Sequence, residues 1–267
     1  MSGFLPDQPG AEVRVSPNFG LRRETLRPDM IVLHYTGMAS GAGAEAWLCD
    51  PASEVSSHYL VHEDGRIVQM VRESDRAWHA GKSSWFGRTD INSCSVGIEI
   101  VNPGHSLGYK PFPKRQIGAV IDLCAGIAGR YAILPQRVLA HSDVAPGRKV
   151  DPGEKFPWKA LFEAGVGHLV PAAPIRPGAA LKAADAGADV EALQSMLALY
   201  GYGVEISGVY DRQTEIVVAA FQRHFRRRLV DGAADASTIR TLQRLLASVK
   251  AAPPNNCGWR LKLQSVT

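Results

Sequence analysis

Long hydrophobic runs are missing from this sequence. No stretch in its 267 residues approaches the roughly 20 unbroken apolar residues that a membrane-spanning helix needs. The N-terminal segment carries charges and prolines where a signal peptide would need an apolar core. The sequence therefore predicts neither a membrane span nor a cleaved leader.

Cysteine is also scarce, and neither sign of charge dominates. The four cysteines lie far apart with no C-x-x-C pair, which argues against a disulfide framework and against a thiolate zinc site. The formal charge of +4 comes from 30 basic and 26 acidic side chains, far from the balance of a protein that neutralises many phosphates. We expect reduced, mostly buried thiols at Cys49, Cys94, Cys124 and Cys257.

The apolar content is sufficient for one medium domain and a small one, with 45% hydrophobic and 21% charged residues. The stretch from Val170 to Ala180, VPAAPIRPGAA, holds three prolines and a glycine, so it is predicted to be a linker between two independently patterned hydrophobic sets. The predicted parts are an N-terminal extension (1–26), an α/β domain (27–169), the linker (170–184), a helical domain (185–249) and a tail (250–267).

Upstream of the linker, short strands alternate with helical segments. The apolar runs 30–34 (MIVLH), 96–101 (VGIEIV) and 137–140 (RVLA) have the length of central strands. Segments 57–62 and 66–71 flank the turn Glu63-Asp64-Gly65 and predict an antiparallel hairpin. Residues 114–131 carry one helical apolar stripe. The predicted fold class is therefore α/β, with a mixed central sheet flanked by helices.

Downstream of the linker, the pattern is helical only. Val190, Leu193, Leu197 and Tyr200 form one apolar stripe, and two more run through 216–225 and 237–246. Asp211 and Asp235 each stand where a helix N-cap is expected. These patterns predict a small three-helix domain.

Two histidines differ from the other six because each ends an apolar strand, where a rigidly held side chain can project into a cleft. These are His34 and His141, and Asp151 follows His141 by ten residues. Two imidazoles and one carboxylate leave a fourth tetrahedral position open, which is typical of a catalytic zinc site. We therefore predict one zinc ion per chain and no organic cofactor.

Two further charged residues suit the same chemistry. Strand alternation places Glu99 on the opposite face from Ile98 and Ile100. Glu99 is either a general base that takes a proton from metal-bound water or a buried partner of an arginine. Lys149 is either a cation that stabilises an oxyanion or a solvated loop charge.

Several ordered motifs resemble those of one enzyme family. IVLHYT, SSHYLVHEDGRIVQMV, AWHAG, SVGIEIVN and HSDVAPGRKVDPGEKFPW are similar, in order and spacing, to motifs of the zinc-dependent N-acetylmuramoyl-L-alanine amidases of the type 2 amidase family. This family shares its fold with peptidoglycan recognition proteins, and the resemblance covers about residues 27–165. It implies zinc-dependent hydrolysis of the amide between N-acetylmuramic acid and L-alanine in peptidoglycan or muropeptides.

The resemblance also implies a role for individual residues. His34, His141 and Asp151 would bind zinc, with Glu99 as catalytic base and Lys149 as the group that stabilises the transition state. Tyr35, His79 and Trp78 would line the cleft near the substrate, with a structural role as the alternative for His79. Trp78 and Trp85 could pack on sugar or peptide, or belong to the core or rim.

The C-terminal segment resembles the small three-helix peptidoglycan-binding module of wall hydrolases. DVEALQSMLALYGY, SGVYDRQTEIVVAAFQRHF and LVDGAADASTIRTL carry this resemblance over residues 189–242. Peptidoglycan or a muropeptide is therefore the expected partner, while the oligomeric state stays open.

We expect a cytoplasmic protein because neither a leader nor a lipobox cysteine is recognised, with the periplasm or cell envelope as the alternative.

Three other functions compete with that of an amidase. A non-catalytic peptidoglycan-binding protein would lack a zinc ligand, and a zinc peptidase would cut within the stem peptide instead. A nucleic-acid binder is suggested by FQRHFRRR at 221–228. Residues 181–249 hold 8 basic and 8 acidic side chains, so we expect this run to be a solvated helix face and predict no nucleic-acid partner.

Overall fold

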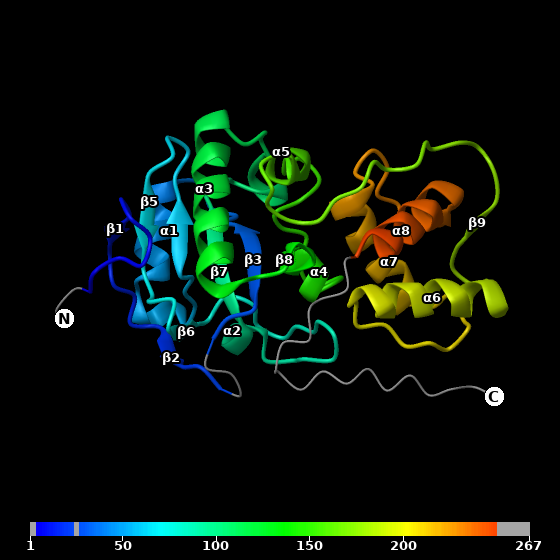
Figure 1. The fold of residues 1–267 in the computed structure, drawn as a ribbon, viewed down its shortest axis with the longest axis horizontal. Coiled ribbons are helices and arrows are strands. Elements are labelled where there is room, and N and C mark those ends of the chain that lie inside the picture. Colours follow the sequence, from blue (N-terminus) through cyan, green and yellow to red (C-terminus); the bar gives the residue numbers. More distant parts are fainter. Residues whose placement is uncertain (1–3, 24–26, 250–267) are drawn as a thin grey trace.

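The computed structural model describes residues 4–23 and 27–249. An α/β part and a helical part lie side by side, in that order along the chain (Figure 1). Within the described residues, no helix has the length and apolarity that crossing a membrane requires.

A six-stranded mixed sheet forms the centre of the α/β part, with the strand order β1-β5-β4-β7-β3-β8. The predicted hairpin is confirmed, because β4 and β5 pair in antiparallel fashion, while the pairs β1–β5, β4–β7, β7–β3 and β3–β8 are parallel. A separate antiparallel pair joins β2 (Phe19–Leu21) to β6 (Asp75–Ala77). The strands of the main sheet are β1 (Glu12–Val13), β3 (Met30–Tyr35), β4 (Tyr59–Val61), β5 (Ile67–Gln69), β7 (Ser95–Ile100) and β8 (Val138–Ala140).

The N-terminal segment is part of this fold where the sequence suggested an extension. It supplies β1 at the sheet edge and β2, and the guanidinium of Arg22 donates to the carbonyls of Glu73 and Ser95. Strands of two or three residues have too few side chains to show an alternating pattern, which is why the sequence did not indicate them.

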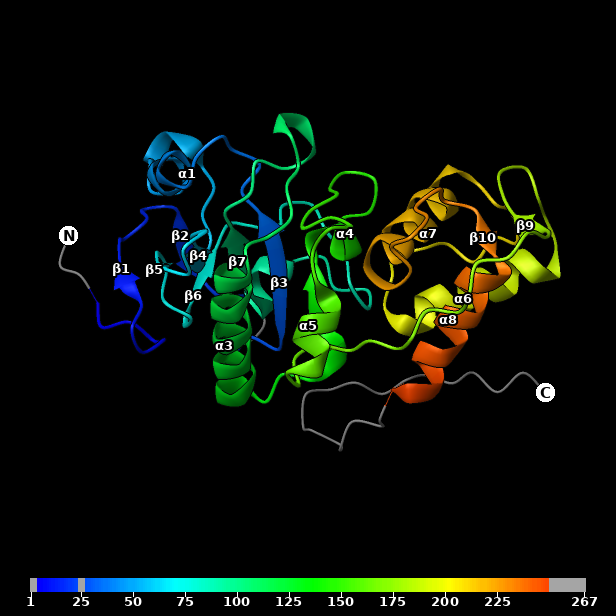
Figure 2. The same cartoon turned by 90° about the horizontal axis from the view of Figure 1, so that it is seen from above.

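Helices cover both faces of the sheet (Figure 2). Helix α3 (Lys114–Tyr131) has the predicted bounds and packs with α5 (Trp158–Glu163) on the face that carries Ile31, Leu33 and Ile98. The other face is covered at one end by α1 (Gly41–Leu48), whose Leu48 packs on Leu60 of β4. The remaining short elements of the α/β part are η1 (Pro51–Ser53), α2 (Ile91–Cys94), η2 (His105–Leu107), η3 (Pro135–Arg137) and α4 (His141–Val144).

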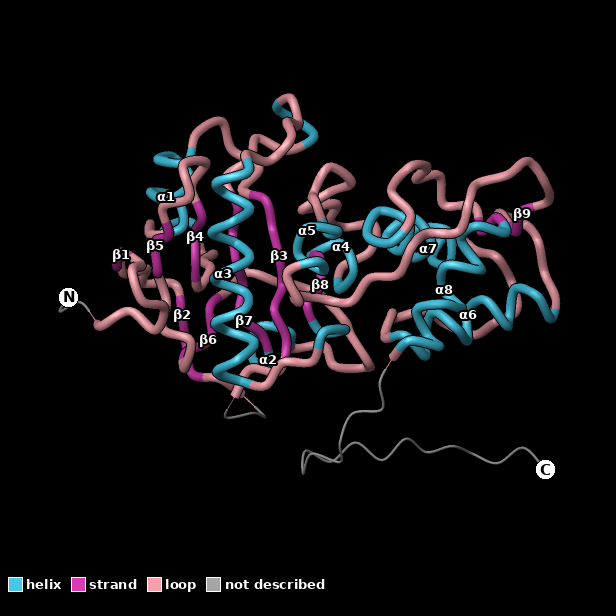
Figure 3. Tube along the Cα trace, turned by 45° about the horizontal axis from the view of Figure 1, so that its top comes forward, coloured by secondary structure: helices cyan, strands magenta, loops and turns pink. Residues whose placement is uncertain are grey.

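The three predicted C-terminal helices are present as α6 (Ala188–Tyr200), α7 (Arg212–Phe225) and α8 (Ala236–Ser248) (Figure 3). Asp211 and Asp235 cap α7 and α8 as expected, each accepting a backbone N–H three residues later at 2.7 Å. The expectation of helices only was wrong, because β9 (Ala180–Leu181) and β10 (Ala234–Asp235) form a short antiparallel pair. We call the segment from β9 to α8 the bundle.

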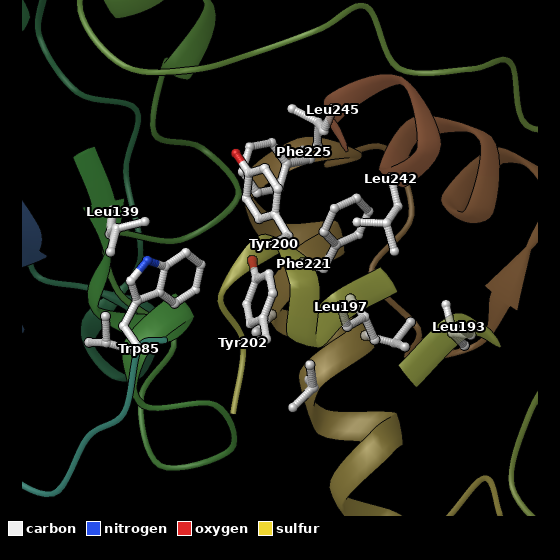
Figure 4. Packing of buried hydrophobic residues seen from close by; sticks show 14 of the residues in the cluster. Trp85, Leu139, Leu193, Leu197, Tyr200, Tyr202, Phe221, Phe225, Leu242 and Leu245 are labelled. Carbon is white, nitrogen blue, oxygen red and sulfur yellow. The ribbon is translucent and has the colours of Figure 1, made fainter. Parts of the chain in front are cut away.

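The expectation of two independent hydrophobic sets was also wrong. One buried cluster joins Trp85 and Leu139 of the α/β part to Tyr200, Tyr202 and Phe221 of the bundle. Figure 4 shows the indole of Trp85 facing the two tyrosine rings, and its ring centroid lies 4.9 Å from that of Tyr202. The proline-rich linker keeps the chain irregular without separating the two parts, so Trp85 belongs to the shared core and not to a substrate surface.

The basic run at 221–228 is not the solvated face that its composition suggested. Arg226 is only 2% exposed, and its guanidinium donates to Leu229 O and Thr238 Oγ1. Arg227 donates to the carbonyl oxygens of Glu154 and Phe156 in the α/β part. These arginines stabilise the fold and the contact between the two parts, which leaves little of the run for a nucleic-acid backbone.

The cysteines that the structure describes are free thiols, with Cys94 and Cys124 buried and Cys49 partly exposed. Cys257 lies outside the described residues.

Candidate metal centre and active site

Three neighbouring parallel strands bring the predicted site residues to one edge of the sheet. In the β3–β7 pair His34 lies directly opposite Glu99, so both side chains project from the same face. In the β3–β8 pair Leu33 lies opposite Ala140, which places the next residue, His141, beside His34. This face is the one opposite α3, because Ile98 and Ile100 point into the core under α3.

The side chains of His34, His141 and Asp151 converge. The Nδ1 atoms of the two histidines lie 2.8 Å apart, and Asp151 Oδ2 lies 3.0 Å from His141 Nδ1 and 3.3 Å from His34 Nδ1. One ligand atom from each residue lies within 4.8 Å of the others, and all three residues are buried. The loop that carries Asp151 is tied to α4, since Ser142 N donates to Asp151 O at 3.0 Å.

Hydrogen bonds on the far side of each ring fix which nitrogen faces the centre. Ser95 Oγ donates to Ile91 O at 2.6 Å, so it accepts from His79 Nε2, and His79 Nδ1 accepts in turn from His34 Nε2 at 3.0 Å. His141 Nε2 donates to Ala80 O at 3.1 Å. Both Nδ1 atoms therefore carry lone pairs that face the carboxylate.

The electrostatics of this group also fit a cation. Burial, with the neighbouring His141, lowers the pKa of His34 to about 4, so its imidazole is neutral near neutral pH. Burial alone favours the protonated acid of Asp151, but His141 and His34, which attract the carboxylate when they carry a proton, outweigh burial and hold the pKa of Asp151 well below its usual range. The Nδ1 atoms of two imidazoles and a carboxylate oxygen at such close range form the kind of donor set that zinc prefers.

Glu99 and Lys149 lie at the same cleft. Burial raises the pKa of Glu99 well above its ordinary value, and the charge of Asp151 adds to the increase while Lys149 opposes it. Within the described part of the chain, Glu99 Oε2 is buried and has no hydrogen-bond partner. Its proposed alternative role, as the buried partner of an arginine, therefore finds no support. A buried oxygen without a donor suits a residue that binds a water molecule or a substrate group.

The cleft has a volume of about 380 Å³ and lies between the end of β3 and helix α1. Tyr35 and Trp78 line it as expected. His79 also reaches the cleft, and both of its ring nitrogens are engaged, one by the imidazole of His34 and the other by Ser95. Trp47, with 47% of its surface exposed, lines the cleft and was missed, because nothing in its local sequence separates it from an ordinary helix residue.

A larger cavity of about 580 Å³ lies between α5, the linker and α7. It contains Lys159, Glu163, Arg227 and Arg228 but none of the residues that converge on the metal centre. Its size therefore does not make it the reaction site.

Family models match both parts of the chain. A model described as N-acetylmuramoyl-L-alanine amidase matches residues 24–154, and a model of a peptidoglycan binding domain matches residues 186–242. The first match contains the whole candidate metal centre with Glu99 and Lys149.

Individual relatives agree with these models. The N-acetylmuramoyl-L-alanine amidase AmiD of Escherichia coli K12 is 41% identical over 232 residues, which are 82% of this chain and 83% of the relative. The 1,6-anhydro-N-acetylmuramyl-L-alanine amidase AmpD of the same organism is 32% identical over 56% of this chain and 88% of its own length.

Solved structures give the same result. The complex of E. coli AmiD with the substrate anhydro-N-acetylmuramic acid-L-Ala-D-gamma-Glu-L-Lys superposes with a TM-score of 0.72 at 37% identity, covering 85% of this chain and 93% of AmiD. AmpDh3 from Pseudomonas aeruginosa has a TM-score of 0.71 at 32% identity and covers 89% of this chain and 96% of its own. With this extent of similarity in sequence and fold, the protein belongs to the N-acetylmuramoyl-L-alanine amidase family.

Proposed function

We propose that this amidase uses one zinc ion held by His34, His141 and Asp151, with Glu99 as general base and Lys149 as the cation that stabilises the oxyanion. The observation that carries the proposal is the convergence of one ligand atom each from His34, His141 and Asp151 within 4.8 Å, at the cleft that Glu99 also lines. Three ligands leave one coordination position for water or substrate, as in catalytic zinc sites.

The reaction of the family is hydrolysis of the amide between N-acetylmuramic acid and L-alanine. A bound zinc ion supplies a Lewis acid that polarises the amide carbonyl and makes a water molecule more acidic. Glu99 takes a proton from the attacking water and delivers it to the alanine nitrogen as the C–N bond breaks. Burial suits Glu99 to both steps, because the raised pKa makes its carboxylate a stronger proton acceptor than an exposed one.

Lys149 contributes charge where the reaction develops it. Its side chain lines the same cleft as Glu99 and Asp151. When water adds to the carbonyl carbon, the carbonyl oxygen becomes an oxyanion, and a fixed ammonium group stabilises that charge more than it stabilises the neutral amide.

We also propose a muropeptide as the substrate that occupies the cleft. Support comes from the AmiD complex, whose ligand is a muropeptide, and from the cleft itself. Trp47, Trp78 and Tyr35 offer flat, partly exposed rings to a sugar or peptide, while the charged centre lies at the base of the cleft.

The test is the mass of the products from a soluble anhydro-muropeptide. We expect the sugar lactyl acid and an intact stem peptide with a free L-alanine amino group, no products after chelation, and recovery on adding zinc. Products cut between two amino acids would make the chain a zinc peptidase. Binding without any products would make it a recognition protein.

A second proposal is that the bundle binds glycan strands, supported by its match to the peptidoglycan binding family. The Glu99→Gln variant, which should not cleave the wall, should stay bound to purified sacculi even when excess soluble muropeptide saturates the cleft. Complete release by the muropeptide would place all wall binding in the cleft.

A further inference from the structure

Asp143, two residues after the ligand His141, has a buried carboxylate that receives hydrogen bonds from both parts of the molecule. Asp143 is 0% exposed. Its Oδ2 accepts the backbone N–H of Ala140 at 2.8 Å and Nδ1–H of His224 at 2.7 Å, and its Oδ1 accepts the hydroxyl of Tyr202 at 2.7 Å. Tyr202 and His224 lie 59 and 81 residues further along the chain, in the bundle.

These bonds act on the turn that carries His141. Helix α4 has four residues and begins at His141, and its N-cap Ala140 has no side chain that could accept a helix N–H. The carboxylate of Asp143 binds the backbone at Ala140 and so fixes the junction between β8 and α4. A carboxyl group buried in the core needs hydrogen-bond partners for its oxygens, and two of the three donors to Asp143 come from the bundle.

The two donors are themselves held rigidly. The ring of His224 stacks on the rings of Trp158 and Phe225, with distances between ring centroids of 3.7 Å and 3.8 Å. Tyr202 packs against Trp85 in the shared core shown in Figure 4. Because these ring contacts hold His224 and Tyr202 in place, the hydrogen bonds from the two residues restrict the movement of Asp143.

We propose that Tyr202 and His224 of the bundle are positioning residues for the metal centre, acting through Asp143 on the orientation of His141. The bundle is then a structural component of the amidase site as well as the proposed wall-binding module. The inference rests on the proposed function, because it takes His141 as a metal ligand.

The test compares two buried tyrosines of the bundle, one whose hydroxyl reaches Asp143 and one whose hydroxyl reaches His168 instead. Tyr202→Phe removes the hydroxyl that reaches Asp143, whereas Tyr200→Phe removes a buried hydroxyl of the same bundle that bonds to His168 Nδ1 at 2.8 Å. Loss of an outer hydrogen bond at a metal site typically weakens metal binding by roughly 10- to 100-fold. We expect a loss of this order in zinc affinity for Tyr202→Phe, and affinity within about twofold of the parent for Tyr200→Phe, measured by competition with a chromophoric chelator.

A second readout separates positioning from general stability. In the cobalt-substituted protein, Tyr202→Phe should change the visible d–d absorption, which reports ligand geometry, while Tyr200→Phe should not. The amide nitrogen of asparagine occupies nearly the place of the histidine Nδ1, so His224→Asn should retain most of the zinc affinity that His224→Leu loses. The melting temperature of the zinc-free variants shows whether any loss of affinity merely follows unfolding.

Equal zinc affinity and equal cobalt spectra for Tyr202→Phe and Tyr200→Phe would overturn the inference, as would equal losses in His224→Asn and His224→Leu. A parent protein that binds no zinc would instead overturn the proposed function. If Tyr202→Phe does not fold, the two His224 variants decide the question.

Discussion

At the residue scale, the charged groups of the cleft are expected to act on the reaction and not on the metal. Glu99→Gln nearly preserves the shape of the side chain but removes the proton acceptor. We expect it to keep its zinc and to lower kcat by roughly 10²- to 10⁴-fold, the usual contribution of general base catalysis. Zinc content and muropeptide turnover are measured on the same sample, and near-normal turnover would assign Glu99 a structural role.

Lys149→Ala should also retain zinc. We expect a fall in kcat of roughly 10²- to 10³-fold, because the ammonium group acts on an oxyanion that exists only during the reaction. Lys159→Ala is the control, since Lys159 is exposed and forms an ion pair with Glu163 on the surface of α5, away from the cleft. A change confined to KM would show that Lys149 binds substrate instead.

Sequence patterns predict the ligands but not the residues that orient them. His34, Glu99 and His141 are recognisable because each ends or interrupts an apolar strand, so the periodicity of the strand tells where the side chain points. The roles of Ser95 and Asp143 depend on partners that lie far away in the chain, such as His79 and His224. No local pattern carries that information.

At the scale of the elements, the contribution of a helix N-cap to the free energy of unfolding can be measured at Asp211. The backbone N–H of Thr214, followed by its hydroxyl, lowers the pKa of Asp211. We expect Asp211→Ala to reduce the free energy of unfolding by about 0.5–2 kcal/mol at neutral pH, while Asp211→Asn, which still accepts the hydrogen bond, should cost less.

The pH dependence of this effect has a defined sign. Because the pKa of Asp211 is lower in the folded state, its contribution is complete above its ordinary unfolded pKa and is lost as the pH falls through the folded value. Urea unfolding at neutral pH and at a pH below the usual aspartate range should therefore show the gap between the parent and Asp211→Ala closing in acid. A constant gap would mean that the ionised cap is not its source.

Element length decides how well the sequence predicts structure. The 18-residue helix α3 has the predicted bounds, because its apolar stripe repeats over several turns. The two-residue strands β1, β9 and β10 have no repeat to recognise, and they form because neighbouring backbone in the fold pairs with them.

At the scale of the whole molecule, the shared core predicts that the α/β part and the bundle unfold together. Trp85→Ala should lower the free energy of unfolding by roughly 3–5 kcal/mol, as for other buried aromatic side chains, and should shift a single transition. Trp47→Ala is the control, because that tryptophan is half exposed. Differential scanning calorimetry with two separate transitions, only one of which responds to Trp85→Ala, would contradict a common core.

The composition of the linker does not reveal the shared core, for a physical reason. Prolines keep residues 170–179 out of helix and sheet, but they do not prevent the flanking surfaces from packing on each other. The linker itself is held against α8, since Ala173 N donates to Thr241 Oγ1 and Ser237 Oγ donates to Ala173 O.

The cytoplasmic location stays a prediction, which cell fractionation would test.

The most direct test of the proposed metal centre is the zinc content of the purified protein and its His141→Ala variant, determined by elemental analysis beside muropeptide turnover. His62→Ala is the control, because His62 pairs with Glu45 and is not part of the convergent group. We expect one zinc ion per chain in the parent and in His62→Ala, and loss of both zinc and turnover in folded His141→Ala. Full zinc content and full turnover in His141→Ala would contradict the assignment.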